Sequence, residues 1–217
     1  MALTTALAVA AVILLAVPAQ AATVVARWNM GDSGSTMSDA TGRGHTGTLH
    51  NVAVGQTGVS GRAFGFAGKP SYVTVPASAD FSPGTANFRI QLSLRFTVRP
   101  SAAVGDYDVL RQGLSTTAGG DYKVEVLQSG QAFCEFRGSG GTGAVSGGPA
   151  LSDGRWHTVV CARTATSVVL TVDGATFSTA KATGSITSKV TVYVGAKDGT
   201  GADQYTGLLD AVSISKG

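Results

Sequence analysis

The segment from Asp153 to Gly174 constrains the fold more than any other part of the chain. It predicts two strands, Trp156–Arg163 and Val168–Val172, which are joined by a short polar turn. Two β-rich runs with a few polar residues between them are typical of a β-hairpin. We expect Trp156 to lie in the core together with Thr158 and Val160, which share its face of the strand.

A longer strand is predicted from Phe88 to Val98, where apolar and polar residues alternate without a break. Such alternation places one face of a strand on the core and the other in water. Further strands are predicted at Val24–Trp28, Arg62–Phe66, Tyr72–Val75, Asp108–Arg111, Tyr122–Leu127, Gln131–Phe136, Val190–Val194 and Leu208–Ile214. Since no part of 22–217 shows a helical stripe, we predict an all-β fold of two packed antiparallel sheets.

The start of the chain predicts export. An uninterrupted run of Ala, Leu, Val and Ile from Ala6 to Val17 would span roughly 18 Å as a helix, against the roughly 30 Å of a bilayer core. Pro18 and Ala19-Gln20-Ala21 follow, as at a signal peptidase site, although no Lys or Arg follows Met1. We predict a signal peptide at 1–21, one secreted domain at 22–217 and no membrane association after cleavage. The alternative is a buried core strand.

Export makes the two cysteines informative, because disulfides persist in oxidising compartments. Cys134 and Cys161 are the only cysteines in the chain, and each lies in the middle of a predicted strand. We predict a disulfide that joins two strands of one sheet. Two buried free thiols are the alternative.

Charge and motif patterns argue against two classes of protein. The net charge of +3 is small for this length, and no cluster of Lys and Arg is present, so we expect no nucleic-acid partner. The stretch Gly138–Gly143 matches a dinucleotide-binding fingerprint, but no helix follows to present its N-terminus to phosphate. We interpret this stretch as a flexible loop.

Several motifs, in order, resemble those of bacterial laminin G-like domains in the concanavalin A-like lectin-glucanase superfamily. They are WNMGDSG, GRAFGFAG, FRIQLSLRFTVRP, DGRWH with its following VDG, VYVGAKDG and YTGLLDAVSIS. The resemblance implies a concanavalin A-like jelly-roll sandwich over residues 22–217. This fold serves both sugar-binding modules and glycosidases, so it leaves the activity open.

The resemblance also implies a structural calcium ion that joins the N-terminal loop to the last strand. Asp210 matches the acid of that last strand, and Asp32 lies in the loop after Trp28. Carboxylate and carbonyl oxygens suit Ca²⁺. The alternatives are that Asp32 caps a turn and that Asp210 binds only backbone amides. Asp198 and Asp203 form a second candidate pair.

Glycosidases of this fold carry carboxylates that alternate along one strand, because two acids must flank the bond that is cleaved. No such pattern is present in the sequence. The nearest acids are Asp106 with Asp108 and Asp121 with Glu125. We interpret them as solvated loop acids with ordinary pKa values, and we predict no catalytic residues and no enzyme activity.

Two features bear on a binding surface. Tyr107, Tyr122 and Tyr205 stand near strand ends, where loops could present them to a sugar. A basic row on the solvent face of the long strand suits acidic or sulfated polysaccharide, unless it is only a solvated sheet face; it comprises Arg89, Arg95 and Arg99.

The sequence therefore favours a secreted, non-catalytic binding module that recognises a polysaccharide or a cell-surface glycan or protein. Two alternatives remain open. One is a glycoside hydrolase with an atypical carboxylate pair, and the other is a structural or adhesive surface protein. The oligomeric state is open as well.

Overall fold

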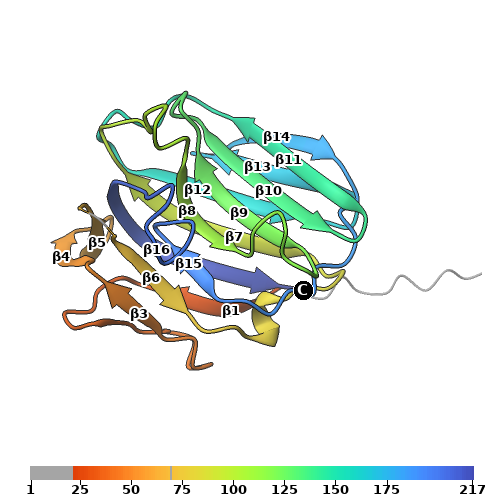
Figure 1. The fold of residues 1–217 in the computed structure, drawn as a ribbon, viewed down its shortest axis with the longest axis horizontal. Helices are drawn as coiled ribbons and strands as arrows, with labels where there is room; N and C mark the ends of the chain where they lie inside the picture. Colours follow the sequence, from red (N-terminus) through yellow and green to blue (C-terminus); the bar gives the residue numbers. More distant parts are fainter. Residues whose placement is uncertain (1–21, 69) are drawn as a thin grey trace, which may run out of the picture.

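Two antiparallel sheets stack face to face around one apolar core in the structure, a computed structural model that describes residues 22–68 and 70–217 (Figure 1). The predicted all-β jelly-roll sandwich is confirmed. The predicted signal peptide at 1–21 lies outside the described residues. No helix among the described residues is long and apolar enough to cross a membrane.

Sheet A has the strand order β14-β13-β12-β7-β16-β5-β4, and β1 pairs with β16 off this path. In Figure 1 the red first strand β1 lies beside the blue last strand β16, so the first and last strands of the fold are neighbours in sheet A. The bounds are β1 Thr23–Trp28, β4 Ala53–Thr57, β5 Arg62–Phe66, β7 Phe88–Arg95, β12 His157–Arg163, β13 Ser167–Val172, β14 Ala175–Ala180 and β16 Gly207–Lys216.

Sheet B has the strand order β11-β10-β9-β8-β15-β6-β3-β2. A single turn of 3₁₀-helix, η1, precedes β7 and spans Ala79–Phe81. The strand bounds are β2 Thr36–Met37, β3 Gly47–His50, β6 Tyr72–Val75, β8 Tyr107–Gln112, β9 Asp121–Val126, β10 Ala132–Gly138, β11 Gly141–Gly147 and β15 Val192–Val194.

The alternation along β7 sorts its side chains as predicted. Phe88, Ile90, Leu92 and Leu94 are fully buried, whereas the arginines between and after them are exposed. The strand ends at Arg95, earlier than predicted, and Val98 is 63% exposed. Pairing with β12 reaches Leu94 and pairing with β16 reaches Arg95, so neither neighbour supports a strand beyond Arg95.

The predicted hairpin is confirmed as β12 and β13, but the expectation for Trp156 is wrong. The inward positions of β12 are His157, Val159 and Cys161, so Trp156 falls on the opposite phase and is partly exposed. The tryptophan of the core is Trp28, which is fully buried and donates its Nε1–H to the carbonyl oxygen of His45 at 2.7 Å.

Cys134 and Cys161 form a disulfide with a Cα–Cα distance of 5.3 Å, which confirms the predicted pairing. The expectation that it joins strands of one sheet is wrong. Cys134 lies on β10 in sheet B and Cys161 lies on β12 in sheet A. Both take the buried phase of their strands, so the bond crosses the core and ties the two sheets together.

The interpretation of Gly138–Gly143 as a flexible loop is also wrong. The chain turns between β10 and β11, and β11 pairs with β10 along its whole length. The glycines permit close packing on sheet A: a Cβ on Gly143 would stand 2.7 Å from Val168, and one on Gly147 would overlap the Phe177 ring. These glycines are needed because the two sheets approach one another closely here.

Candidate functional site

The outer face of sheet B carries a dense set of charged side chains over three neighbouring strands. Along β9 and β10, every second residue points into the core, and the residues between them point outward. The outward set on these strands and on β8 comprises Asp108, Arg111, Asp121, Lys123, Glu125, Glu135 and Arg137. The alternating acids and bases in DYKVEV and AFCEFR are a signal of this face that the sequence analysis missed.

A β-bulge brings two of these residues to the same side. Asp108 and Arg111 are three apart, and residues three apart on a regular strand point to opposite faces. The register of β8 against β9 shifts between Asp108 and Leu110, so Asp108 pairs with Glu125 and Arg111 pairs with Lys123. The extra residue in β8 thus restores both charges to the outer face.

Each basic side chain of this face contacts an acid. Arg111 donates through Nη1 to Asp108 Oδ2 at 2.7 Å in a fully buried pair. The other contacts are Lys123 Nζ to Glu125 Oε1 at 2.7 Å, Arg137 Nε to Asp121 Oδ1 at 2.9 Å and Lys197 Nζ to Asp203 Oδ2 at 2.9 Å. The Arg137 Nε–H is not aimed at the carboxylate, so that contact is an ion pair without a hydrogen bond.

A pocket of about 220 Å³ opens over these charges. The loop residues Leu114 and Lys197 line both this pocket and a neighbouring one of about 300 Å³. Asp203 lines both it and a third pocket of about 460 Å³, which is walled mainly by small and backbone groups. Each of the two outer pockets therefore adjoins the charged one, which lies between them.

The acids of this face are not solvated loop acids, so that expectation is wrong. Asp108, Asp121 and Glu125 are at most 3% exposed. Burial, followed by the Glu125 and Asp203 carboxylates, raises the pKa of Asp106 to about 6. Burial also raises the pKa of Asp108, although Arg111 opposes the shift. The sequence places these acids near glycine-rich turns, but in the fold those turns cover them.

The predicted calcium ligands Asp32 and Asp210 have separate sets of partners. Asp32 accepts hydrogen bonds from the backbone and the hydroxyl of Ser38. Asp210 is buried and accepts from the backbone amides of Val59, at 2.8 Å, and Ser60, at 3.4 Å. These contacts are those of the alternatives, a turn cap and an amide acceptor, and calcium at this pair stays a prediction.

The second candidate pair is divided between two environments. Asp198 accepts from the backbone and hydroxyl of Thr200 within its own turn. Asp203 faces the charged pocket together with Asp106, and both lie close to the buried carboxylate of Asp108. The structure thus gives Asp203 neighbours almost a hundred positions away in the chain.

The predicted aromatic residues are not on the surface. Tyr107, Tyr122 and Tyr205 are at most 5% exposed and pack in the core. The partly exposed aromatic rings of sheet B lie on the outer phase of their strands. They are Phe133 beside Lys123 (5.3 Å from Nζ to the ring centroid) and Tyr193 beside Tyr72, which stacks on His50 at 4.5 Å.

Two residues of the predicted basic row, Arg89 and Arg95, lie on the outer face of β7 in sheet A, whereas Arg99 follows the end of that strand. Arg89, Arg95 and Arg99 are exposed. Two of them are held by neighbouring loops: Arg95 donates to the carbonyl of Gly154 at 2.7 Å, and Arg99 donates to Ser152 Oγ at 3.1 Å. A pocket of about 290 Å³ lies beside Arg95, but Arg89 does not line it.

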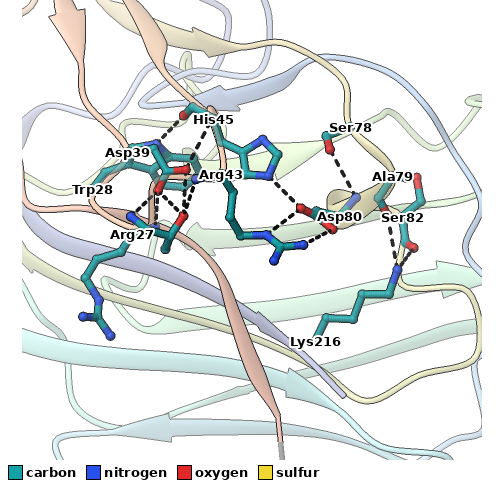
Figure 2. Close-up of polar contacts among 11 residues, drawn as sticks. Arg27, Trp28, Asp39, Arg43, His45, Ser78, Ala79, Asp80, Ser82 and Lys216 are labelled. Carbon is teal, nitrogen blue, oxygen red and sulfur yellow. Dashed lines mark hydrogen bonds and ion pairs between the residues drawn. The ribbon is translucent and has the colours of Figure 1, made fainter.

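Figure 2 shows a second polar cluster, in which Arg43 and His45 both point at Asp80. The Arg43 guanidinium makes two hydrogen bonds to Asp80 and holds the pKa of this carboxyl below its ordinary value. Nearby, Asp39 accepts from the backbone amides of Thr41 and His45. The Asp80 carboxylate thus joins the N-terminal loop to η1, and the Asp39 carboxylate binds within the N-terminal segment, so we interpret the cluster as structural.

Comparison with known proteins identifies the family. The model of the concanavalin A-like lectin/glucanases superfamily, of the laminin G type, matches residues 67–217, and the chain belongs to this superfamily. Comparison with curated protein sequences gives no match.

Solved structures share the fold at low identity. The binding domain of Paraclostridial Mosquitocidal Protein 1 has a TM-score of 0.69 at 14% identity over 88% of this chain, which spans only 48% of that domain. Domain 4 of AbnA, an extracellular arabinanase from Geobacillus stearothermophilus solved with arabinotriose, has a TM-score of 0.67 at 15% identity over 91% of this chain and 94% of that one. Domains LG4-5 of the mouse laminin alpha1 chain have a TM-score of 0.55 at 20% identity, over 70% of this chain and 40% of that one.

Proposed function

We propose that this chain is a secreted, non-catalytic module that binds a glycan on the outer face of sheet B. The observation that carries the proposal is the row of paired acids and bases at the floor of a pocket that adjoins two others. Pockets for apolar ligands are lined mainly by apolar side chains with few polar groups. The opposite lining here favours a polar ligand that is rich in hydrogen-bonding groups.

The paired side chains suit hydroxyl groups in particular. A carboxylate has about four lone-pair positions and a lysine ammonium has three donors, so one ion pair leaves most of them free. A sugar hydroxyl both donates and accepts, and it can therefore bridge Glu135 and Lys123 across the two strands. The rings of Phe133 and Tyr193 offer apolar faces on the same side of the sheet.

Related structures support the same class of ligand. The arabinanase domain whose length this chain matches was solved with a trisaccharide, arabinotriose. Another structure of this fold is the binding domain of a botulinum neurotoxin in complex with SialylT. The series of adjoining pockets on sheet B is consistent with an oligosaccharide rather than a single sugar.

A glycan array followed by titration calorimetry on the mature chain tests the proposal. Glu135→Gln and Tyr193→Ala change outward side chains of sheet B and should each weaken binding by about tenfold or more, the size of one good charge-assisted hydrogen bond or stacking contact. Arg89→Gln, on the outer face of sheet A, is the matched control and should leave the affinity unchanged. Binding that survives both sheet B changes but is lost in the control would move the site to sheet A.

A hydrolase is the second candidate, because the carboxylates of Asp106, Glu125 and Glu135 line one pocket. Retaining and inverting glycosidases need two acids on opposite sides of the bond, about 5–5.5 Å or 6.5–9.5 Å apart. Release of reducing sugar from the glycans that bind best distinguishes the two functions. We expect no release of reducing sugar, and turnover that Glu125→Gln abolishes would establish the enzyme.

A further inference from the structure

Three carboxylates from distant parts of the chain converge at one end of the charged face. Asp106 precedes β8, Asp108 lies in β8, and Asp203 comes from the loop before β16. One ligand atom of each lies within 4.8 Å of those of the other two. The backbone holds this spacing, because the Asp108 amide donates to the carbonyl of Asp203 at 2.8 Å.

Two carboxylate oxygens of this cluster have no partner. Asp108 is fully buried, and its Oδ1 has no hydrogen bond to any residue in 22–68 or 70–217, whereas its Oδ2 is taken by Arg111. The Oδ1 of Asp106 is likewise buried and without a partner in the same ranges. A buried carboxylate oxygen that lacks a hydrogen bond is costly, and a cation bound between these side chains would offset that cost.

We propose that Asp106, Asp108 and Asp203 bind a hard divalent cation, Ca²⁺. The three side chains offer only oxygen ligands, which calcium prefers, and no His or Cys is among them to favour zinc. Asp203 borders two open pockets, so water reaches the site and can complete the coordination that calcium requires.

The basic neighbours leave room for the ion. Arg111 occupies only one oxygen of Asp108, and Lys197 contacts only Oδ2 of Asp203. The Lys197 side chain is 40% exposed, so it can turn into solvent when a stronger positive charge arrives. The bound ion ties the loop that carries Asp203 to the start of β8.

This site is separate from the calcium position that the family resemblance implies at Asp32 and Asp210, and it does not depend on glycan binding. Those two acids contact Ser38 and the amides of Val59 and Ser60, and neither belongs to the convergent cluster. Variants can therefore tell the two positions apart with the metal alone.

Calorimetric titration of CaCl₂ into the chelator-treated, glycan-free chain tests the inference. We expect one site per chain, in the roughly 10⁻⁴–10⁻³ M range of extracellular modules, and a higher melting temperature in calcium than in EDTA. Asp106→Asn and Asp203→Asn should each weaken binding by about tenfold or more, since even outer-shell changes cost that much. In EDTA, Asp106→Asn should melt no lower than wild type, because it loses an unpartnered carboxylate from an acidic cluster, whereas Asp203→Asn also loses its ion pair with Lys197 and should melt slightly lower but cooperatively.

Two matched control variants show which group of acids binds the calcium ion. Asp198→Asn lies in the same loop but outside the cluster, and Asp210→Asn removes the family-type candidate. Both should keep the wild-type affinity for this site. Calcium binding that Asp210→Asn abolishes while Asp106→Asn and Asp203→Asn retain it would overturn the inference, as would the absence of both heat and a melting shift at millimolar calcium.

Discussion

His157 begins β12 on the inward side of sheet A, yet both nitrogens of its ring contact carboxylates. Nδ1 lies 2.7 Å from Asp173 and Nε2 lies 2.9 Å from Asp153, so the side chain joins the two ends of the hairpin segment. Burial lowers the pKa of this imidazole, but the two carboxylates outweigh burial and the net effect is to raise it. His157 therefore holds the two ends of the Asp153–Gly174 segment together.

We predict that this contact makes stability depend on pH. Because the folded-state pKa of His157 exceeds the ordinary 6.5, its contribution to stability is complete below that pH and is lost as the pH rises through the folded value. The melting-temperature difference between wild type and His157→Asn should therefore be largest in mild acid and should shrink in mild alkali. His50→Asn, which changes a half-buried histidine of sheet B, is the control, and an equal pH trend in both variants would contradict the assignment.

Substitution of the two tryptophans should change the unfolding free energy by different amounts, because one ring faces the core and the other faces outward. Trp28→Ala removes a fully buried ring and should cost about 3–5 kcal/mol of unfolding free energy. Trp156→Ala removes a partly exposed ring on the outer phase and should cost less than about half of that. Denaturant unfolding of both variants measures the difference, and equal costs would show that Trp156 packs as a core residue.

At the scale of the element, the inward-facing residues of a strand determine which strand of the opposite sheet it can pack against. Cys134 and Cys161 face one another because both lie on the inward phase of strands in opposite sheets. On β11, Gly143 and Gly147 leave the space that Val168 and Phe177 of sheet A fill. The two sheets therefore lie close together at this end of the sandwich because a disulfide joins them and because glycines leave room for side chains of the other sheet.

Removal of the disulfide should destabilise the sandwich without changing its fold. The two cysteines are 27 residues apart, and a loop of that length gives about 3–4 kcal/mol in the chain-entropy model. The double variant Cys134→Ala/Cys161→Ala should lose about this much and should become insensitive to reductant. If instead the wild-type protein melts at the same temperature with and without reductant, while thiol titration shows full reduction, the prediction fails.

At the scale of the whole molecule, the two outer faces differ in how charge is arranged. Sheet A presents arginines without carboxylates beside them in the described contacts, whereas each base of the sheet B face contacts an acid. Paired charges give short-range hydrogen bonds, and an unpaired row attracts anions over longer distances, where salt screens it.

Glycan binding on sheet B should therefore respond weakly to salt. We expect the dissociation constant to rise less than about threefold when NaCl is raised from roughly 50 to 300 mM, because each base of this face is already paired with an acid and offers no free positive charge to screen. Calorimetry at the two salt concentrations measures this change. A steep loss of affinity with salt that Arg89→Gln removes would assign binding to the arginine row of sheet A.

The sequence alone determined the fold class, the pairing of the two cysteines and most of the strands, although it predicted no strand at β2, β3, β4, β11 or β14. These follow from alternation within short runs, from resemblance along the whole chain and from the presence of only two cysteines, and none of them requires distances across the molecule. The alternation of residues predicted the strand Phe88–Arg95 and the β12–β13 hairpin to within a few residues of their observed ends.

Only the tertiary structure decided which acids meet. Asp106 and Asp203 lie about a hundred residues apart, and the β8 bulge that turns Asp108 toward them depends on pairing with β9. The sequence does not show that loops cover these carboxylates, that the disulfide crosses the core or that Phe133 faces outward. Burial and pKa are set by everything that packs around a group, and that packing exists only once both sheets have assembled.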